Sequence, residues 1–387
     1  PPTYEAYREY LEGDKAYYRR EFRKAIEYYS RAIGLDPDFM LPMMWTVWAY
    51  FTLGEYAETE PVLRKLDKSR DKLDPVHRHQ LDYFGARLRG DNEKAYNAIY
   101  QAEIAKERKK IGYLVAGAAN GINRPKEAVE ILKKIDPERE NIRRWVGFWG
   151  LWTTAHHMLG NHRQELKVAR RGRKYHPERL EALGYELRAL AALARIQEVN
   201  KLIDESLSLP PQQWSPSQCM LNAARELRAR GYRQASLQVL ERAFKWFESR
   251  TKEESETRSH RVRLARALYT AERWEEAQDI FEALHEEFPD EIDYLGWLGV
   301  VAARRGDKEE AVRISSLLEN IDRLYIFGLH TYWRARIASL LGEKENAVRI
   351  LREALAQGVY YSALHPSMDF EPLQDYPPFK ELIKPKG

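Results

Sequence analysis

The chain has 387 residues, of which 44% are hydrophobic, and it carries 63 Lys+Arg against 59 Asp+Glu. Its 10 Trp, 23 Tyr and 12 Phe exclude an intrinsically disordered chain, and its net charge of +4 identifies no class of partner. A single cysteine, Cys219, excludes a disulfide framework and a cysteine-based zinc site. The longest uncharged apolar stretch, Phe39 to Gly54, contains Pro42 and is shorter than the roughly 20 residues of a membrane-spanning helix.

A recurrent small residue runs along the chain. The segment Phe22 to Ala32 reads aromatic, x, x, Ala, x, x, x, aromatic, and the segment Trp274 to Phe281 repeats this pattern. Steps of 33 to 42 residues separate the corresponding positions, and such a period is typical of repeat proteins. In chain order these positions are Ala25, Thr59, Ala95, Ala128, Glu165, Val199, Ala235, Ala277, Ala311 and Ala347.

Each repeat predicts two helices packed as a hairpin. An apolar stretch with a period near 3.6 precedes the small residue, as in Leu264, Leu268 and Ala271. A glycine five residues before the small residue favours a positive φ just past the end of the first helix. These glycines are Gly54, Gly90, Gly160, Gly306 and Gly342. Because no hairpin buries its apolar face alone, about ten of them are expected to stack into one continuous core.

The repeats resemble the tetratricopeptide (TPR) family. The residues at the offsets of its pattern include Leu295, Leu298, Gly299, Ala302 and Ala311 in one repeat and Trp149, Trp152 and Pro177 in another. Glu165 and Val199 depart from the small residue, and the 42-residue step after Ala235 predicts a charged loop from Thr251 to Thr257. The resemblance implies an all-α fold, a right-handed superhelical solenoid of about ten TPR-like hairpins, over residues 1–356.

The C-terminal segment, residues 357–387, is predicted to be a capping tail. It contains the sequences Pro366-Ser367-Met368-Asp369-Phe370-Glu371-Pro372-Leu373 and Tyr376-Pro377-Pro378-Phe379. It resembles the closing segment of TPR regions attached to bacterial serine/threonine kinases, winged-helix regulators and cyclases. The resemblance implies the sensory or docking part of a larger bacterial signalling protein, either cytoplasmic or the extracytoplasmic part of a membrane-anchored regulator. Because a solenoid end needs a cover, we favour a structural role for the tail itself.

No catalytic, cofactor or metal site is predicted. Adjacent histidines such as His156 and His157 do not share a helix face, and no carboxylate with metal-ligand spacing completes a set with them or with His162. We expect His156 and Cys219 to be buried between helices. The sequence contains no phosphate loop, nucleophile elbow, kinase signature or HExxH motif. The chain is therefore predicted not to be an enzyme.

The predicted function is a protein- or peptide-binding scaffold, because repeat stacks expose a long concave surface. The alternative is a nucleic-acid-binding helical repeat that uses residues 137–250, which hold 20 basic and 12 acidic side chains. We consider nucleic acid the weaker prediction, because the basic stretch Arg170 to His176 is expected to be a solvated helix face and no series of base-reading residues recurs. Self-association through the open ends is a third interpretation, and membrane insertion is not expected.

The predicted binding residues follow from the resemblance. In TPR proteins the positions eleven and seven residues before the small residue face the concave side. In the last five repeats half of these ten positions are arginine, although 41 arginines in 387 residues would place about one there by chance. These arginines are Arg188, Arg228, Arg266, Arg304 and Arg336, and the aromatic residues predicted to line the first repeats are Tyr7, Tyr10, Tyr17, Trp48, Phe51 and Phe84.

An extended peptide with an acidic segment fits both groups. Aromatic side chains would anchor it, and guanidinium groups would receive its carboxylates or phosphates. The alternative interpretation is that the arginines pair with acidic neighbours on adjacent helices.

Overall fold

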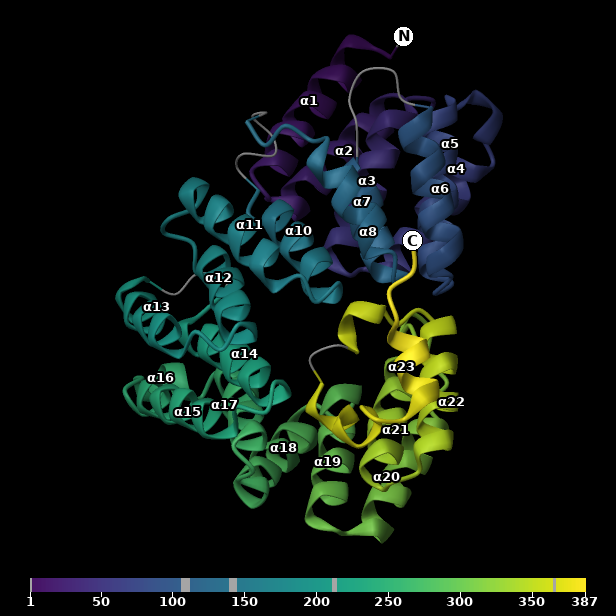
Figure 1. Ribbon diagram of the computed structural model, residues 1–387. Helices are drawn as coiled ribbons and strands as arrows, with labels where there is room; N and C mark the ends of the chain where they lie inside the picture. Colours follow the sequence, from purple (N-terminus) through teal and green to yellow (C-terminus); the bar gives the residue numbers. More distant parts are fainter. Residues whose placement is uncertain (1, 106–111, 139–144, 211–213, 365–366) are drawn as a thin grey trace. The chain divides into compact units, whose positions relative to one another are not determined.

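A computed structural model describes residues 2–105, 112–138, 145–210, 214–364 and 367–387. The chain falls into two compact units, Pro1–Ile111 and Gly112–Gly387. The described residues form α-helices and short 3₁₀ helices and contain no strand (Figure 1). The predicted all-α solenoid of TPR-like hairpins is therefore confirmed. None of the described helices combines the length and apolar character that crossing a membrane requires.

Unit 1 is built from consecutive helical hairpins. Its elements are α1 (Tyr4–Tyr18), α2 (Phe22–Leu35), α3 (Met40–Leu53), α4 (Tyr56–Asp67), the 3₁₀ helix η1 (Arg70–Lys72), α5 (Pro75–Leu88) and α6 (Asn92–Ile104). The side chains of Asp74 and Asp91 accept backbone N–H groups at the starts of α5 and α6, which is the usual N-cap interaction. Met44, Leu66 and Phe84 belong to an apolar core between α3, α4 and α5.

Unit 2 continues the same pattern. Its elements are α7 (Gly112–Gly121), α8 (Pro125–Lys133), α10 (Gly147–Met158), α11 (His162–Tyr175), α12 (Leu180–Ala192), α13 (Ile196–Ser208), α14 (Pro216–Ala229), α15 (Arg233–Glu248), α16 (Lys252–Ser255), α17 (Arg258–Thr270), α18 (Trp274–Glu287), α19 (Ile292–Arg305), α20 (Lys308–Glu319), α21 (Leu329–Leu340), α22 (Lys344–Ala356), η2 (Tyr361–Ala363), η3 (Met368–Leu373) and α23 (Pro377–Ile383). The short helix α16 lies within the segment that we predicted to be a charged loop. Thr251 and Glu254 form a capping box at the N-terminus of α16, so the inserted residues between α15 and α17 include a short helix.

The small residues of the repeat lie at the helix contacts, as predicted. None of the following is more than 1% exposed: Ala25, Thr59, Ala95, Ala128, Glu165, Val199, Ala277, Ala311 and Ala347. The prediction at Ala235 is wrong by one residue, because Ala235 is only partly buried and Ser236 is 2% exposed. The hydroxyl group of Ser236 donates to the carbonyl oxygen of Ala224 at 2.7 Å, so a small polar residue fills this contact without an unpaired hydroxyl group.

The glycines between paired helices have the predicted conformation. Their φ angles lie between +68° and +82° at Gly54, Gly90, Gly160, Gly306 and Gly342. At Gly54 and Gly306 the glycine is the C-cap residue itself, in the left-handed region. Side chains with a Cβ rarely adopt this region, so glycine allows the chain to reverse within a few residues.

Ala277 tests the repeat register. It is fully buried on α18, in the same core cluster as Leu268 and Phe281. We expect Ala277→Leu to lower the free energy of unfolding by about 1–3 kcal/mol, because three added heavy atoms overpack this contact. Urea denaturation measures the effect, and Val312→Leu on the exposed face of α20 is the control. A thermal midpoint for Ala277→Leu within about a degree of wild type would contradict the register.

The tail of unit 2 packs against both ends of that unit. Phe370, Leu373 and Phe379 join a core cluster with Ala335 of α21 and Leu351 of α22. Further along the tail, the backbone N–H of Lys386 donates to the carbonyl oxygen of Asn123 at 2.8 Å, and the Asn123 amide donates to Lys384. The tail is thus an integral part of the packing of unit 2.

Candidate functional site

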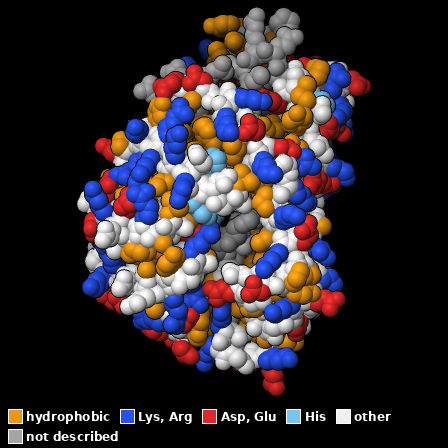
Figure 2. All heavy atoms as spheres, in the orientation of Figure 1, with side chains coloured by type: hydrophobic (Ala, Val, Ile, Leu, Met, Phe, Trp, Pro, Cys, Tyr) orange, Lys and Arg blue, Asp and Glu red, His pale blue; other side chains and the backbone are white. Residues whose placement is uncertain are grey.

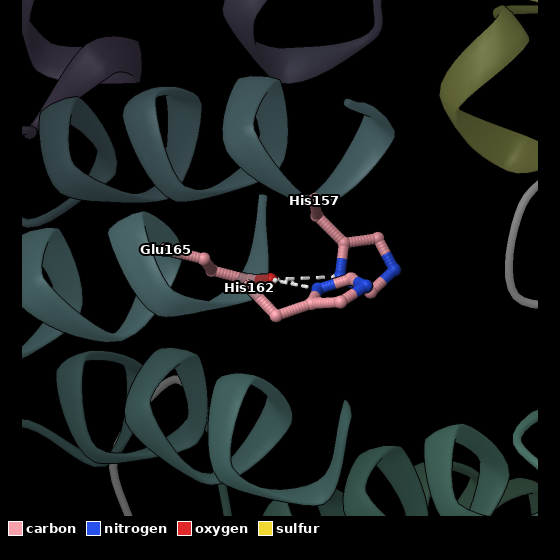
Figure 3. Close-up of side chains that lie close together, drawn as sticks. All are labelled: His157, His162 and Glu165. Atoms are coloured by element: carbon pink, nitrogen blue, oxygen red, sulfur yellow. Dashed lines mark hydrogen bonds and ion pairs between the residues drawn. The ribbon is translucent and has the colours of Figure 1, made fainter. Parts of the chain in front are cut away.

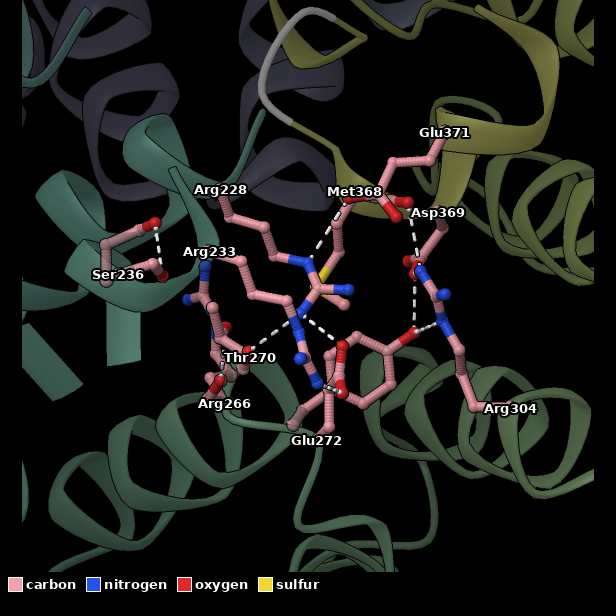
Figure 4. Close-up of polar contacts among 12 residues, drawn as sticks. Arg228, Arg233, Ser236, Arg266, Thr270, Glu272, Arg304, Met368, Asp369 and Glu371 are labelled. Carbon is pink, nitrogen blue, oxygen red and sulfur yellow. Dashed lines mark hydrogen bonds and ion pairs between the residues drawn. The ribbon is translucent and has the colours of Figure 1, made fainter. Parts of the chain in front are cut away.

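The predicted arginines all lie on the first helices of their hairpins. They occupy α12 (Arg188), α14 (Arg228), α17 (Arg266), α19 (Arg304) and α21 (Arg336). The structure joins three of them through the C-terminal tail, which places acidic side chains between them (Figure 4). The other two, Arg188 and Arg266, form no ion pair with the described residues of the tail.

Asp369 of η3 is the centre of this arrangement. Its carboxylate is fully buried and accepts two bonds from Arg336, at 2.8 Å from Nε and 2.6 Å from Nη2. Arg304 Nη2 donates to the other carboxylate oxygen at 3.2 Å, and the Tyr269 hydroxyl group donates to it as well. The Arg336 guanidinium lies 3.7 Å from the centre of the Trp333 ring, a cation–π contact that fixes its plane.

The electrostatics of Asp369 follow from these contacts. Burial alone would raise the pKa of the carboxyl group, but the positive charges of Arg336 and Arg304 outweigh it and lower the pKa below its ordinary value. Asp369 is therefore held as a buried carboxylate. Each oxygen has its own donors, which is the condition under which a buried charge is tolerated.

A second acidic residue of the tail reaches Arg228. Glu371 lies 3.2 Å from Arg228 Nε, and Glu272, just past the end of α17, lies 2.7 Å from Arg228 Nη1. Glu272 also pairs with Arg233. One partner of Arg228 belongs to a neighbouring hairpin, as the alternative interpretation predicted, whereas the other belongs to the tail, a partner that neither interpretation predicted.

Arg266 differs from the other four arginines. It has no ion pair and no side-chain hydrogen bond with any residue that the structure describes. Burial, together with the positive charges of Arg225 and Arg336, lowers its pKa to about 10.

The shift of the small residue from Ala235 to Ser236 changes one of the predicted concave positions. The residue eleven positions before Ser236 is Arg225 of α14, whereas the residue eleven positions before Ala235 is Ala224. The corrected register thus adds a fourth arginine at this position, with Arg188, Arg266 and Arg336.

Arg188 belongs to a different cluster, which contains two histidines. Glu165, fully buried on α11, accepts a bond from Arg188 at 2.7 Å and lies 3.0 Å from Nδ1 of both His157 and His162 (Figure 3). Our statement that no carboxylate completes a histidine set is therefore wrong. The signal in the sequence was a glutamate where the repeat has a small residue, three positions after His162.

The proton donors of this cluster indicate a hydrogen-bonded network rather than a metal site. The three ligand atoms lie within 4.8 Å of one another. However, Arg230 Nη2 lies 2.6 Å from Nε2 of His162, and a guanidinium only donates, so this Nε2 accepts and Nδ1 carries the proton toward Glu165. Arg188 occupies the other oxygen of Glu165. Burial would raise the pKa of Glu165, but Arg188 and His157 outweigh it and hold the pKa well below its ordinary value.

The aromatic residues predicted for the first repeats form two clusters in unit 1. Trp48 and Phe51 lie 4.6 and 5.2 Å, ring centre to ring centre, from the fully buried Phe84. In the second cluster, Tyr10 is 8% exposed beside Tyr7, which is 45% exposed. Tyr17 packs edge-on against Trp45 at 4.9 Å. Phe84 and Tyr10 therefore contribute to the core, and Tyr7 is the most exposed of the six.

The basic stretch on α11 is not a free positive surface. Arg170 pairs with Glu186 and Glu198, and Arg173 pairs with Glu186 and Glu205. Arg170, Arg171 and Lys174 are exposed, as expected for a solvated helix face, and the next hairpin supplies acidic partners for this face. On the face shown in Figure 2, basic and acidic side chains are intermixed. Paired arginines leave less charge for phosphate contacts, which disfavours the nucleic-acid alternative.

Two parts of the chain match a known family model. A tetratricopeptide-repeat family model matches residues 10–72 and 262–314. No curated protein matches the chain. Among solved structures, Naa15/Naa10 bound to HypK-THB matches at 13% identity and a TM-score of 0.30, covering 89% of this chain but only 57% of that one.

Two further structures give similar values. The anaphase-promoting-complex hetero-tetramer Cut9–Hcn1 matches at 13% identity and a TM-score of 0.34, covering 90% of this chain and 86% of that one. The yeast Sti1 TPR2AB domain in complex with pHSP90 matches at 20% identity and a TM-score of 0.25, covering 68% and 98%. Since all three TM-scores are low, we base the fold assignment on the helices themselves.

Proposed function

We propose that this chain is a non-enzymatic scaffold that binds a protein or extended peptide along the first helices of its hairpins. One observation carries the proposal. The arginines of unit 2 already hold a short acidic segment, the 3₁₀ helix η3 (Met368–Leu373), whose Asp369 and Glu371 reach three guanidiniums. A surface that accommodates an acidic segment of its own chain has the chemistry to accommodate another.

The proposal extends to the context of the chain. The tail carries the sequence on which the resemblance to TPR regions of bacterial signalling proteins rests, so we propose a docking or sensory role within such a protein. In unit 1, Tyr7 and the rings around Trp48 are the proposed apolar anchors, because aromatic side chains contribute much binding energy at little entropic cost.

A peptide array tests the proposal directly. The full chain is screened against extended peptides of varied charge, and the hits are measured by fluorescence anisotropy at 50 and 300 mM salt after nuclease treatment. We expect micromolar binding of acidic peptides that survives nuclease and weakens with Arg266→Glu. The control is Arg349→Glu on the exposed side of α22, which should change nothing. Binding only to nucleic acid, or binding equally reduced by both variants, would contradict the proposal.

A further inference from the structure

Two arginines of α17 lie without acidic partners. Arg263 and Arg266 are one turn apart, so they share a face of the helix. Within the described residues, the only side-chain partner of Arg263 is the hydroxyl group of Ser259 at 3.2 Å, and its Nε is buried without a hydrogen-bond partner. Arg266 has neither an ion pair nor a side-chain hydrogen bond there. By contrast, Arg188, Arg228, Arg304 and Arg336 each form an ion pair with an acidic side chain.

The surroundings of the pair supply more positive charge rather than a counter-ion. The positive charges of Arg225 on α14 and Arg336 on α21 repel the guanidinium of Arg266, and each disfavours the charged form of Arg266. Asp293 is the carboxylate that favours this charge, but it accepts the indole N–H of Trp333 at 2.9 Å and lies beyond ion-pair distance from Arg266. Arg336 is committed to Asp369. The local charge is therefore unbalanced.

The physical consequence is that this place favours an anion from outside the chain. Withdrawing guanidiniums from water has a cost, which a chain usually offsets with a carboxylate. Here the offset is missing, while the Trp297 ring, 5.9 Å from the Arg266 guanidinium, orients that group. Guanidiniums in this situation bind planar or tetrahedral oxyanions through paired N–H donors.

We propose that Arg263 and Arg266 form an anion-binding site that receives a carboxylate or phosphoryl group of the bound peptide, an inference that rests on the proposed function for the identity of the ligand. The site lies beside the surface that the chain's own tail covers. Arg336 is close enough to Arg266 for its positive charge to lower the pKa of Arg266, and Arg336 also forms the ion pair with Asp369 of the tail. The acidic group of the external peptide would therefore bind to Arg263 and Arg266, which form no ion pair with the tail.

The first experiment needs no peptide. The thermal midpoint of the full chain is measured in sodium phosphate and in sodium acetate against sodium chloride of equal ionic strength. We expect phosphate to raise the midpoint of wild type by a few degrees more than that of Arg263→Gln/Arg266→Gln, because ligands that bind the native state stabilise it. In chloride, the double variant should be as stable as wild type or more so, since it removes unbalanced buried charge. An equal phosphate response in both proteins would overturn the site.

The second experiment identifies the ligand group. Three versions of a hit from the peptide array are compared, carrying phosphoserine, glutamate or glutamine at one position. We expect the charged versions to bind at least tenfold more tightly than the glutamine version, and Arg266→Gln to abolish that difference, whereas Arg349→Gln should preserve it. The larger effect of phosphoserine or of glutamate decides between a phosphoryl group and a carboxylate. If all three bind equally, the proposed function stands and this inference falls.

Failure of the proposed function has a different signature. If no peptide binds but phosphate still stabilises wild type more than the double variant, the anion site stands and the peptide-binding role falls.

Discussion

Asp369→Asn is expected to lower the free energy of unfolding of unit 2 by about 3–5 kcal/mol, the usual effect of breaking a buried ion pair by removing one partner. The carboxylate is fully buried, and its removal leaves Arg336 and Arg304 facing each other without a counter-charge. Urea denaturation measures the loss. Glu371→Gln is the matched control on the same segment, because Glu371 is 33% exposed and should cost much less.

The pH dependence of this loss gives an independent check. Because the folded-state pKa of Asp369 lies below its unfolded value, the ion pair stabilises the fold fully above the unfolded pKa of about 4. That contribution is lost as the pH falls through the lower folded-state pKa. The difference between wild type and Asp369→Asn should therefore be constant from pH 8 to pH 5 and shrink only below about pH 4. A difference that grows on acidification would contradict the assignment.

A compensating variant separates the ion pair from the packing of the tail. Replacing Asp369 and Arg336 together by leucine and methionine removes both charges and should recover much of the stability, since an apolar pair of similar volume often replaces a buried ion pair at little cost. Arg304 keeps the Met368 carbonyl oxygen, 2.9 Å from Nη2, as its acceptor. A double variant no more stable than Asp369→Asn would show that the carboxylate acts through the backbone geometry of η3 instead.

The helical hairpins could be predicted from the sequence because the residues that define each hairpin lie within a few positions of one another. The glycines that need a positive φ and the small residues between paired helices recur at fixed distances, so their positions were predictable, including Gly306 and Ala311. The one-residue shift at Ser236 was not, because a serine hydroxyl group that finds a backbone carbonyl packs like a small apolar residue. Because of that shift, Arg225 was not counted among the arginines that lie eleven residues before the small residue.

The partners of the arginines were beyond sequence reasoning for a different reason. Which helix carries each arginine follows from the period, but Asp369 lies 33 residues from Arg336 and 65 from Arg304 along the chain. Nothing local fixes how the tail crosses the inner helices. The alternative that the arginines pair with acidic neighbours of the chain describes Arg188 and Arg228. It also holds for Arg304 and Arg336, except that their acidic partner lies on η3 of the tail and not on a helix of an adjacent hairpin. Because the tail was predicted only to be a cap, Asp369 was not considered as a partner of Arg304 and Arg336.

Glu165 is the residue at which the repeat pattern and the structure give opposite predictions. The pattern has alanine at this position in most repeats, so Glu165→Ala restores the consensus and by that argument should stabilise the chain. The structure predicts the reverse, because the glutamate is fully buried and accepts bonds from Arg188, His157 and His162. Alanine leaves a cavity and several buried donors without an acceptor.

We therefore expect Glu165→Ala to lower the free energy of unfolding by about 3–5 kcal/mol. The folded-state pKa of Glu165 lies below its unfolded value, so its contribution is complete above about pH 4.3 and is lost at lower pH. Urea denaturation at pH 7 and pH 3 measures both effects, and the loss in Glu165→Ala should be smaller at pH 3. Glu165→Gln is the second variant, because it keeps the volume and removes the charge. If Glu165→Ala is as stable as wild type at pH 7, the consensus argument holds and the buried network contributes nothing.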